Sequence, residues 1–267
     1  MTTEATTPSA TVSVPAPSAG RHAAANVLTI AKRELSGYFN SPVAYVFIVI
    51  FLLLCGFFTF MVGRFFQRNE ASLVAFFMWH PWLYLFLVPA VGMRLWSEER
   101  RLHTIELLLT MPVTAWQAIT GKFLASWLFL GIALALTFPL VGTVMFLGHP
   151  DLGTIFCAYI GSLLVAGAYL AISSMTSALT RNQVVSFILS VVACLFLILA
   201  GWPPVTDMLV QWAPAWLVDG IASFSVMPHF ESFQRGVIDS RDLIYFLSVM
   251  VFALFTTGVI IRSHRAG

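Results

Sequence analysis

The sequence is poor in charged residues. Asp, Glu, Lys and Arg make up 10% of its 267 positions, whereas hydrophobic residues make up 59%. A soluble domain usually has about 25% charged residues, so this composition excludes an ordinary soluble domain. The formal net charge is only +2, and no basic surface for nucleic acid is expected. The chain is therefore predicted to be an integral membrane protein.

Six stretches contain no Asp, Glu, Lys or Arg and approach or exceed the roughly 20 apolar residues that a membrane-spanning helix needs. They are residues 43–63, 74–93, 123–147, 154–179, 184–202 and 243–261. Each is apolar on every side, whereas polar and apolar residues alternate along the strands of an outer-membrane barrel. The sequence predicts an all-α membrane domain over residues 25–267. Residues 1–24, rich in Ala, Thr, Ser and Pro, are predicted to be a disordered tail.

The motifs of common catalytic sites are also missing. The chain has no H-E-x-x-H and no nucleophile elbow, and its spans hold no carboxylate of the kind that ion-coupled transporters use. A phosphate-binding loop is absent too, because Gly121-Lys122-Phe123 lacks both the upstream glycine and the hydroxyl residue. These absences argue against an enzyme. If the protein moves something uphill, the energy must come from a separate subunit.

The chain has only three cysteines, Cys55, Cys157 and Cys194. All three lie within apolar stretches, without the C-x-x-C spacing of a metal or redox site. We expect small buried hydrophobic side chains, and no metal or other cofactor.

One short block, from Ser97 to Pro112, is dense in charge. Ser97 is predicted to cap a helix, with Glu98 and Glu99 near the positive end of its dipole. On a helical projection, Leu102, Ile105 and Leu109 share one face, and Glu99, His103 and Glu106 share another. This predicts a cytoplasmic helix with a packing side and a docking side. The alternative is an interfacial helix whose charged face is only solvated.

The sidedness of Lys and Arg predicts the orientation, because cytoplasmic flanks are enriched in positive charge. With the N-terminus inside, ten of these residues fall on the cytoplasmic side: Arg21, Lys32, Arg33, Arg94, Arg100, Arg101, Lys122, Arg181, Arg262 and Arg265. The other four fall outside: Arg64, Arg68, Arg235 and Arg241. Both termini and the block from Ser97 are then cytoplasmic.

Two extramembrane segments carry an amphipathic pattern. Residues 26–39 predict an interfacial helix before the first span, although an ordinary basic flank is the alternative. Residues 203–242 contain interfacial tryptophans and an apolar face, so one or two short helices are predicted on the outer surface. Pro81, Pro89 and Pro139 are expected to kink the spans in which they lie.

Two groups of polar residues within the spans are candidates for function. His80 could bind a substrate or shuttle protons, but a neutral, hydrogen-bonded histidine near the outer interface is the preferred interpretation. Four hydroxyl side chains near the end of the fourth span are expected mainly to pack helices together, and a polar lining of a translocation path is the alternative. They are Ser173, Ser174, Thr176 and Ser177.

Several motifs resemble a known family. The segment S-E-E-R-R-L-H-T-I-E-L-L-L-T-M-P-V-T from Ser97, followed by Gly121-Lys122-Phe123, resembles the coupling-helix region of ABC transporter permeases of the type 2 exporter class. K-R-E-L-S-G-Y-F-N-S-P-V-A-Y from Lys32, S-A-L-T-R-N-Q from Ser177 and H-F-E-S-F-Q-R-G-V-I-D-S-R-D from His229 are similar to the same class. Within it, the chain most resembles the gliding-motility and nitrous-oxide-reductase-maturation permeases.

The resemblance implies six spans, an N-terminal elbow helix and a coupling helix between the second and third spans. It also implies two permease subunits, identical or related, that pair with two ATP-binding subunits. By position, five residues would lie in or near the cleft of the ATPase partner: Glu98, Glu99, Arg100, Thr104 and Glu106. His103 departs from the family, which often has Gly there, so this position puts the local docking geometry in question.

The sequence therefore predicts the membrane subunit of an ATP-driven transporter in the cell inner membrane. ATP hydrolysis is expected in the partner subunit, and membrane lipid and an extracytoplasmic accessory protein are further expected partners. The alternative is a non-transporting scaffold that transmits force from a cytoplasmic ATPase to an extracytoplasmic partner through residues 203–242. A stand-alone secondary transporter is a third hypothesis.

Overall fold

The computed structural model describes residues 19–67, 72–102 and 114–263, and within these ranges every regular element is a helix. The α-helices are α1 (Ala19–Phe39), α2 (Pro42–Phe57), α3 (Val74–Phe77), α4 (His80–Gly92), α5 (Arg94–Arg101), α7 (Ala115–Ala135), α8 (Pro139–Leu147), α9 (Leu152–Leu179), α10 (Gln183–Leu199), α11 (Pro203–Val210), α12 (Ala215–Ser223), α13 (Val226–Gln234) and α14 (Ser240–Ser263). A π-helical turn (Phe58–Val62) and a 3₁₀ turn (Phe65–Gln67) extend α2. The all-α prediction is confirmed.

Four of the described helical segments are long and apolar enough to cross a membrane: 42–67, 115–147, 152–179 and 240–263. A fifth qualifies if α10 and α11, which are bent by 67° at a short break, count as one span. The protein is a multi-pass membrane protein. The predicted count of six is supported for four or five segments only.

The second predicted span, residues 74–93, differs from the expectation. The structure divides it into α3 and the 13-residue α4, with the break at Met78 and Trp79. Pro81 accounts for the position of the break, because proline lacks a backbone N–H and is tolerated in the first turn of a helix. The third predicted span divides likewise before Pro139, where α7 ends and α8 begins.

Helix α9 forms the centre of the bundle. Within its membrane-length window 72% of the residues are buried, against 28% to 39% in the three other long segments. It packs against α4, α5, α7, α10, α13 and α14. Small residues permit these close contacts: a β-carbon at Gly161 would lie 2.6 Å from the Phe233 side chain of α13. The core of the molecule therefore surrounds α9.

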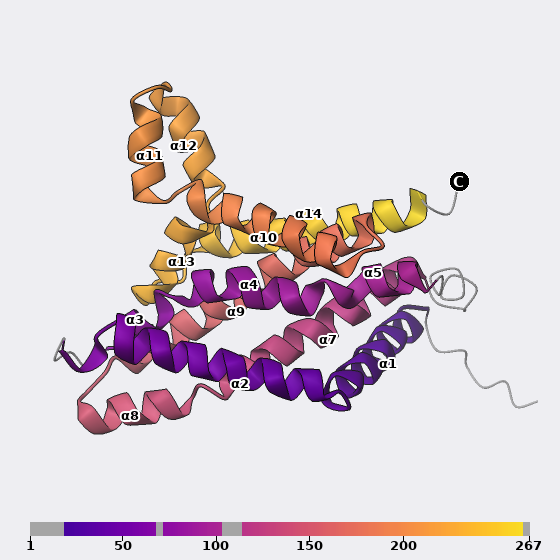
Figure 1. The fold of residues 1–267 in the computed structure, drawn as a ribbon, viewed down its shortest axis with the longest axis horizontal. Coiled ribbons are helices and arrows are strands. Elements are labelled where there is room, and N and C mark those ends of the chain that lie inside the picture. Colours follow the sequence, from indigo (N-terminus) through magenta and orange to yellow (C-terminus); the bar gives the residue numbers. More distant parts are fainter. Residues whose placement is uncertain (1–18, 68–71, 103–113, 264–267) are drawn as a thin grey trace, which may run out of the picture.

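The two ends of the bundle carry different elements. Figure 1 shows α5 and the C-terminal end of α14 at one end, and α3, α8 and α13 at the other. The prediction of one or two short helices within 203–242 was too low, because three are present. Only α13 packs closely on α9, whereas α11 and α12 form a pair that projects from the bundle (Figure 1).

Helix α1 begins at Ala19, within the segment predicted to be a disordered tail. The A-G-R-H-A-A-A stretch has strong helix formers, which explains the earlier start. The helix lies along α7, where a β-carbon at Gly121 would meet Ile30 at 2.8 Å. Its assignment as an interfacial elbow stays a prediction.

Candidate coupling site

The first residues of the charged block, Ser97 to Arg101, belong to helix α5. This helix begins at Arg94 and follows α4 after the single residue Met93. The predicted cap at Ser97 was wrong: this residue lies in the middle of α5, is fully buried, and donates its hydroxyl to the Met93 carbonyl. Glu98 and Glu99 accordingly lie in the second half of the helix, away from the positive end of its dipole. The physical reason is that the chain passes almost directly from α4 into α5 and leaves no free helix start at Ser97.

Hydrogen bonds from serines of α9 hold the start of α5. The Ser177 hydroxyl accepts the backbone N–H groups of Trp96 and Ser97, both at 3.0 Å, and donates to the Met93 carbonyl at 2.8 Å. The indole Nε1–H of Trp96 donates to Ser174 Oγ at 3.0 Å. All of these groups are buried, so their loss would leave unsatisfied donors. Helix α5 is thus fixed to the central helix.

Close packing supports the same contact. A β-carbon at Gly92 would lie 2.3 Å from Cβ of Ser173, so the end of α4 approaches α9 more closely than any larger residue allows. At the other end of α5, the Arg100 guanidinium donates to the Ala178 carbonyl near the C-terminus of α9. Carbonyl groups in the last turn of a helix lack partners within it, and a basic side chain satisfies one of them here.

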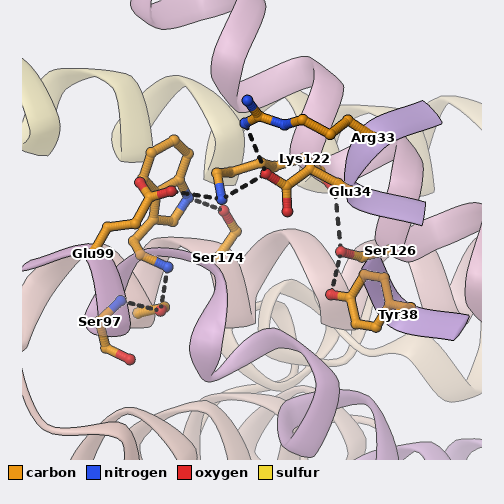
Figure 2. Close-up of polar contacts among 10 residues, drawn as sticks. Arg33, Glu34, Tyr38, Ser97, Glu99, Lys122, Ser126 and Ser174 are labelled. Carbon is orange, nitrogen blue, oxygen red and sulfur yellow. Dashed lines mark hydrogen bonds and ion pairs between the residues drawn. The ribbon is translucent and has the colours of Figure 1, made fainter. Parts of the chain in front are cut away.

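One buried lysine joins three helices, as Figure 2 shows. The ammonium of Lys122 on α7 lies 2.8 Å from Glu99 Oε1 on α5 and 3.3 Å from Glu34 Oε1 on α1. It also lies 5.6 Å from the ring centroid of Trp96. Since the Lys122 side chain is only 8% exposed, solvent screens these interactions weakly. We call Glu34, Glu99, Lys122 and Trp96 the Lys122 junction.

Helix α1 has a second connection to α7 beside this junction. The Tyr38 hydroxyl lies 2.9 Å from Ser126 Oγ, and the Tyr38 ring stacks on Phe129 with centroids 5.0 Å apart. Ser126 in turn donates to the Lys122 carbonyl (Figure 2). The three helices that carry the junction are therefore held by packing and hydrogen bonds as well as by charge.

A cleft of about 480 Å³ lies beside the Lys122 junction, between α1, α2, the α4–α5 segment and α7. Charged side chains line one part of it: Glu34, Glu98, Glu99, Arg94 and Lys122. Apolar side chains line another, among them Ala44, Phe47, Val91 and Phe129. The cleft is thus amphipathic.

The sequence was compared with known protein families and with curated proteins. Residues 83–213, just under half of the chain, match the family described as ABC-2 family transporter protein. The match supports an ABC-2 type permease. A search of curated proteins found no significantly similar sequence. The matched region contains α5, Lys122 and the serines of α9, whereas Glu34 lies before it.

Permeases of this family are normally not catalytic, and their ATPase is a separate subunit. In the part of the chain that the structure describes, no group of three His, Cys, Asp or Glu side chains is placed to hold a metal ion. The three cysteines are free thiols; Cys55 and Cys194 are buried and Cys157 is partly so.

The structure describes three of the six residues predicted for the ATPase interface. Glu99 and Arg100 contact α7 and α9 of the permease itself, and Glu98 lines the cleft. The other three, His103, Thr104 and Glu106, lie outside the described residues. At the end of α5, Arg101 and Leu102 are exposed. The described residues of the predicted interface therefore make more contacts within the chain than the sequence suggested.

The four predicted hydroxyl side chains near the end of α9 are at most 4% exposed. Three of them bond groups on other helices, and Ser173 packs against Gly92 of α4. Thr176 bonds Ser190 of α10, Ser173 bonds the carbonyl of Tyr169, and the other two hold α5. This geometry is that of packing between helices.

His80, the first residue of α4, is fully buried. Its Nδ1 lies 3.0 Å from the Phe76 carbonyl, and aromatic rings surround it, with Phe76 at 4.4 Å and Tyr84 at 5.3 Å. Among the described residues its Nε2 has no hydrogen-bond partner. No described carboxylate forms an ion pair with His80.

Sequence reasoning missed Glu34, Trp96 and Lys122 as members of the site. Lys122 was counted only as a cytoplasmic positive charge, and Glu34 only as part of a polar helix face. One signal was present: Lys122 stands between Gly121 and Phe123 at the start of an apolar stretch, where a charge needs a partner.

Proposed function

We propose that this protein is the permease subunit of an ABC transporter, which works with separate ATP-binding subunits and a second permease subunit. In this proposal α1 is the elbow helix, and α5 with the residues that follow it is the coupling element. The α3–α4 segment supplies the sixth span beside the five helical candidates, because it runs along α9 with the others (Figure 1).

The observation that carries the proposal is the double attachment of α5. Serine hydroxyls fix it to the buried central helix, and the Lys122 junction connects it to α1 and α7. A force applied to the end of α5 must therefore move these helices with it or break buried polar contacts, each of which is costly. This is the mechanical property that a coupling element requires.

Two further features support separate ATP-binding subunits and a cytoplasmic position for α5. The sequence has no phosphate-binding loop, so the energy for transport comes from another chain. The excess of Lys and Arg on one side of the spans supports a cytoplasmic position for α5 and both termini, with the spans in the cell inner membrane. The gliding-motility and nitrous-oxide-reductase-maturation permeases are the subgroup that we propose. The family match does not favour a non-transporting scaffold.

A photocrosslinking experiment tests the coupling proposal. A photoreactive amino acid replaces Leu102, which is 58% exposed at the end of α5, in cells that produce the whole transporter. We expect a crosslink to an ATP-binding subunit. The matched control is Val237, which is 55% exposed between α13 and α14 and should give no such product. Failure of Leu102 to crosslink, together with purification of the permease without any ATPase, would refute the proposal.

A further inference from the structure

The amphipathic cleft beside the Lys122 junction has the properties of a binding site for a small amphiphile. Its volume of about 480 Å³ lies within the range of small-molecule sites in proteins. The apolar part is formed by Phe47, Phe129 and their neighbours, and the charged part by α5 and the junction. A ligand that fills both parts needs a hydrocarbon chain and a charged headgroup.

The charges define the headgroup. Three carboxylates and two cationic side chains line the cleft, so its formal charge is −1. Lys122 is already engaged by Glu34 and Glu99. Glu98 and Arg94 lie four positions apart on α5, and neither forms an ion pair with another described residue. The cleft therefore presents one carboxylate for a cation and one guanidinium for an anion.

We propose that the cleft binds the headgroup and part of one acyl chain of a membrane phospholipid whose headgroup carries a primary ammonium group. The ammonium, with three N–H donors, would bind the Glu98 carboxylate. The phosphate would bind Arg94, since guanidinium groups suit phosphate oxygens. The acyl chain would lie along Ala44, Phe47 and Phe129. This proposal goes beyond the coupling function and does not depend on the ATP-binding partner.

Native mass spectrometry of the intact permease tests the proposal. The protein is released from nanodiscs that contain equal amounts of phosphatidylethanolamine, phosphatidylcholine and phosphatidylglycerol. We expect one phosphatidylethanolamine to be retained in preference to the other two. The Glu98→Gln variant should retain about tenfold less, because the hydrogen bond to the ammonium is no longer assisted by a negative charge. Its matched control, Glu231→Gln, changes a 54%-exposed carboxylate on α13 and should behave as wild type.

A second pair of variants tests the apolar part without disturbing packed atoms. Gly37 lines the cleft, and a β-carbon there would meet nothing within 4 Å; the same is true of Gly56 on α2, outside the cleft. We expect Gly37→Trp to reduce lipid retention severalfold and Gly56→Trp to leave it unchanged.

Three results would overturn the proposal. The first is that the permease retains the three lipids equally, or retains no lipid. The second is that Glu98→Gln retains as much lipid as the wild type. The third is that Gly37→Cys forms disulfide-linked dimers that the wild-type chain does not form. The last result would assign the cleft to a second copy of the permease instead.

Discussion

Replacement of Lys122 by Met tests the central electrostatic contact of the structure. At an effective dielectric constant of about 20, the distances of 2.8 Å to Glu99 and 3.3 Å to Glu34 correspond to attractions of about 6 and 5 kcal/mol. Desolvation of the buried ammonium cancels much of this. Removal of one partner of a buried ion pair costs about 3–5 kcal/mol, because the other charge is left uncompensated.

The expected loss for Lys122→Met is about 2–4 kcal/mol in the free energy of unfolding, somewhat less than for a fully buried pair. The two carboxylates that remain have side chains 26% and 21% exposed, so water solvates them in part. Unfolding by SDS in mixed micelles, followed by tryptophan fluorescence, measures the change. The matched control is Arg33→Met, whose side chain is 66% exposed and whose pair with Glu34 should contribute about 0–1 kcal/mol.

A second experiment shows whether the loss of stability comes from the missing positive charge or from lost packing. If the loss arises because the two carboxylates no longer contact the ammonium, neutralising them as Glu34→Gln and Glu99→Gln in the Lys122→Met background should restore most of the stability. A double-mutant cycle should also give a larger coupling for Lys122 with Glu99 than with Glu34, as the shorter distance requires. A loss below about 1 kcal/mol for Lys122→Met, or no recovery in the triple variant, would refute the reasoning.

Three further outcomes are expected. Ser177→Ala should lower the free energy of unfolding by about 1–3 kcal/mol and speed amide exchange in α5, because two buried N–H groups lose their acceptor; unchanged exchange would contradict this. Gly92→Ala should cost about 1–3 kcal/mol through the close contact with α9, whereas Gly56→Ala, with open space around it, should be neutral or slightly stabilising in the same assay. Asp151 caps α9, and hydrogen bonds from the Thr154 hydroxyl and then from backbone N–H groups lower its pKa. Its contribution to stability is therefore fully present above its unfolded pKa of about 3.9. This contribution is lost as the pH falls through the lower pKa of the folded state. Asp151→Asn should flatten this part of the stability profile, and an unaltered acid slope would count against the cap.

The helical architecture was accessible from the sequence because the bilayer imposes a simple rule. Long uncharged stretches must form helices. Four of the six predicted stretches correspond to segments that qualify in the structure, and a fifth does so if the bent pair α10 and α11 counts as one span. The exception, residues 74–93, also contains no Asp, Glu, Lys or Arg. It breaks at Met78 and Trp79, where the local turn depends on how Pro81 and the aromatic side chains pack. Hydropathy does not contain that information.

The candidate site was predicted less completely, since its contacts are between distant parts of the chain. Glu34, Glu99 and Lys122 come from three helices, and a single sequence does not reveal which charges meet. The Ser97 error has a similar cause. Serine before two glutamates is a common helix start, but the preceding turn of α4 was already helical, so the residue became an interior one.

The burial of α9 has a consequence for how the protein is made. Helix α5 leaves the ribosome long before α9, because Trp96 and Ser177 are separated by 81 residues. During that interval the N–H groups of Trp96 and Ser97 lack their final acceptor. Within α9, Ser173 and Thr176 bond carbonyls of their own helix and need no partner to enter the membrane. Attachment of α5 is therefore a late event in biogenesis, which the insertion of α9 completes.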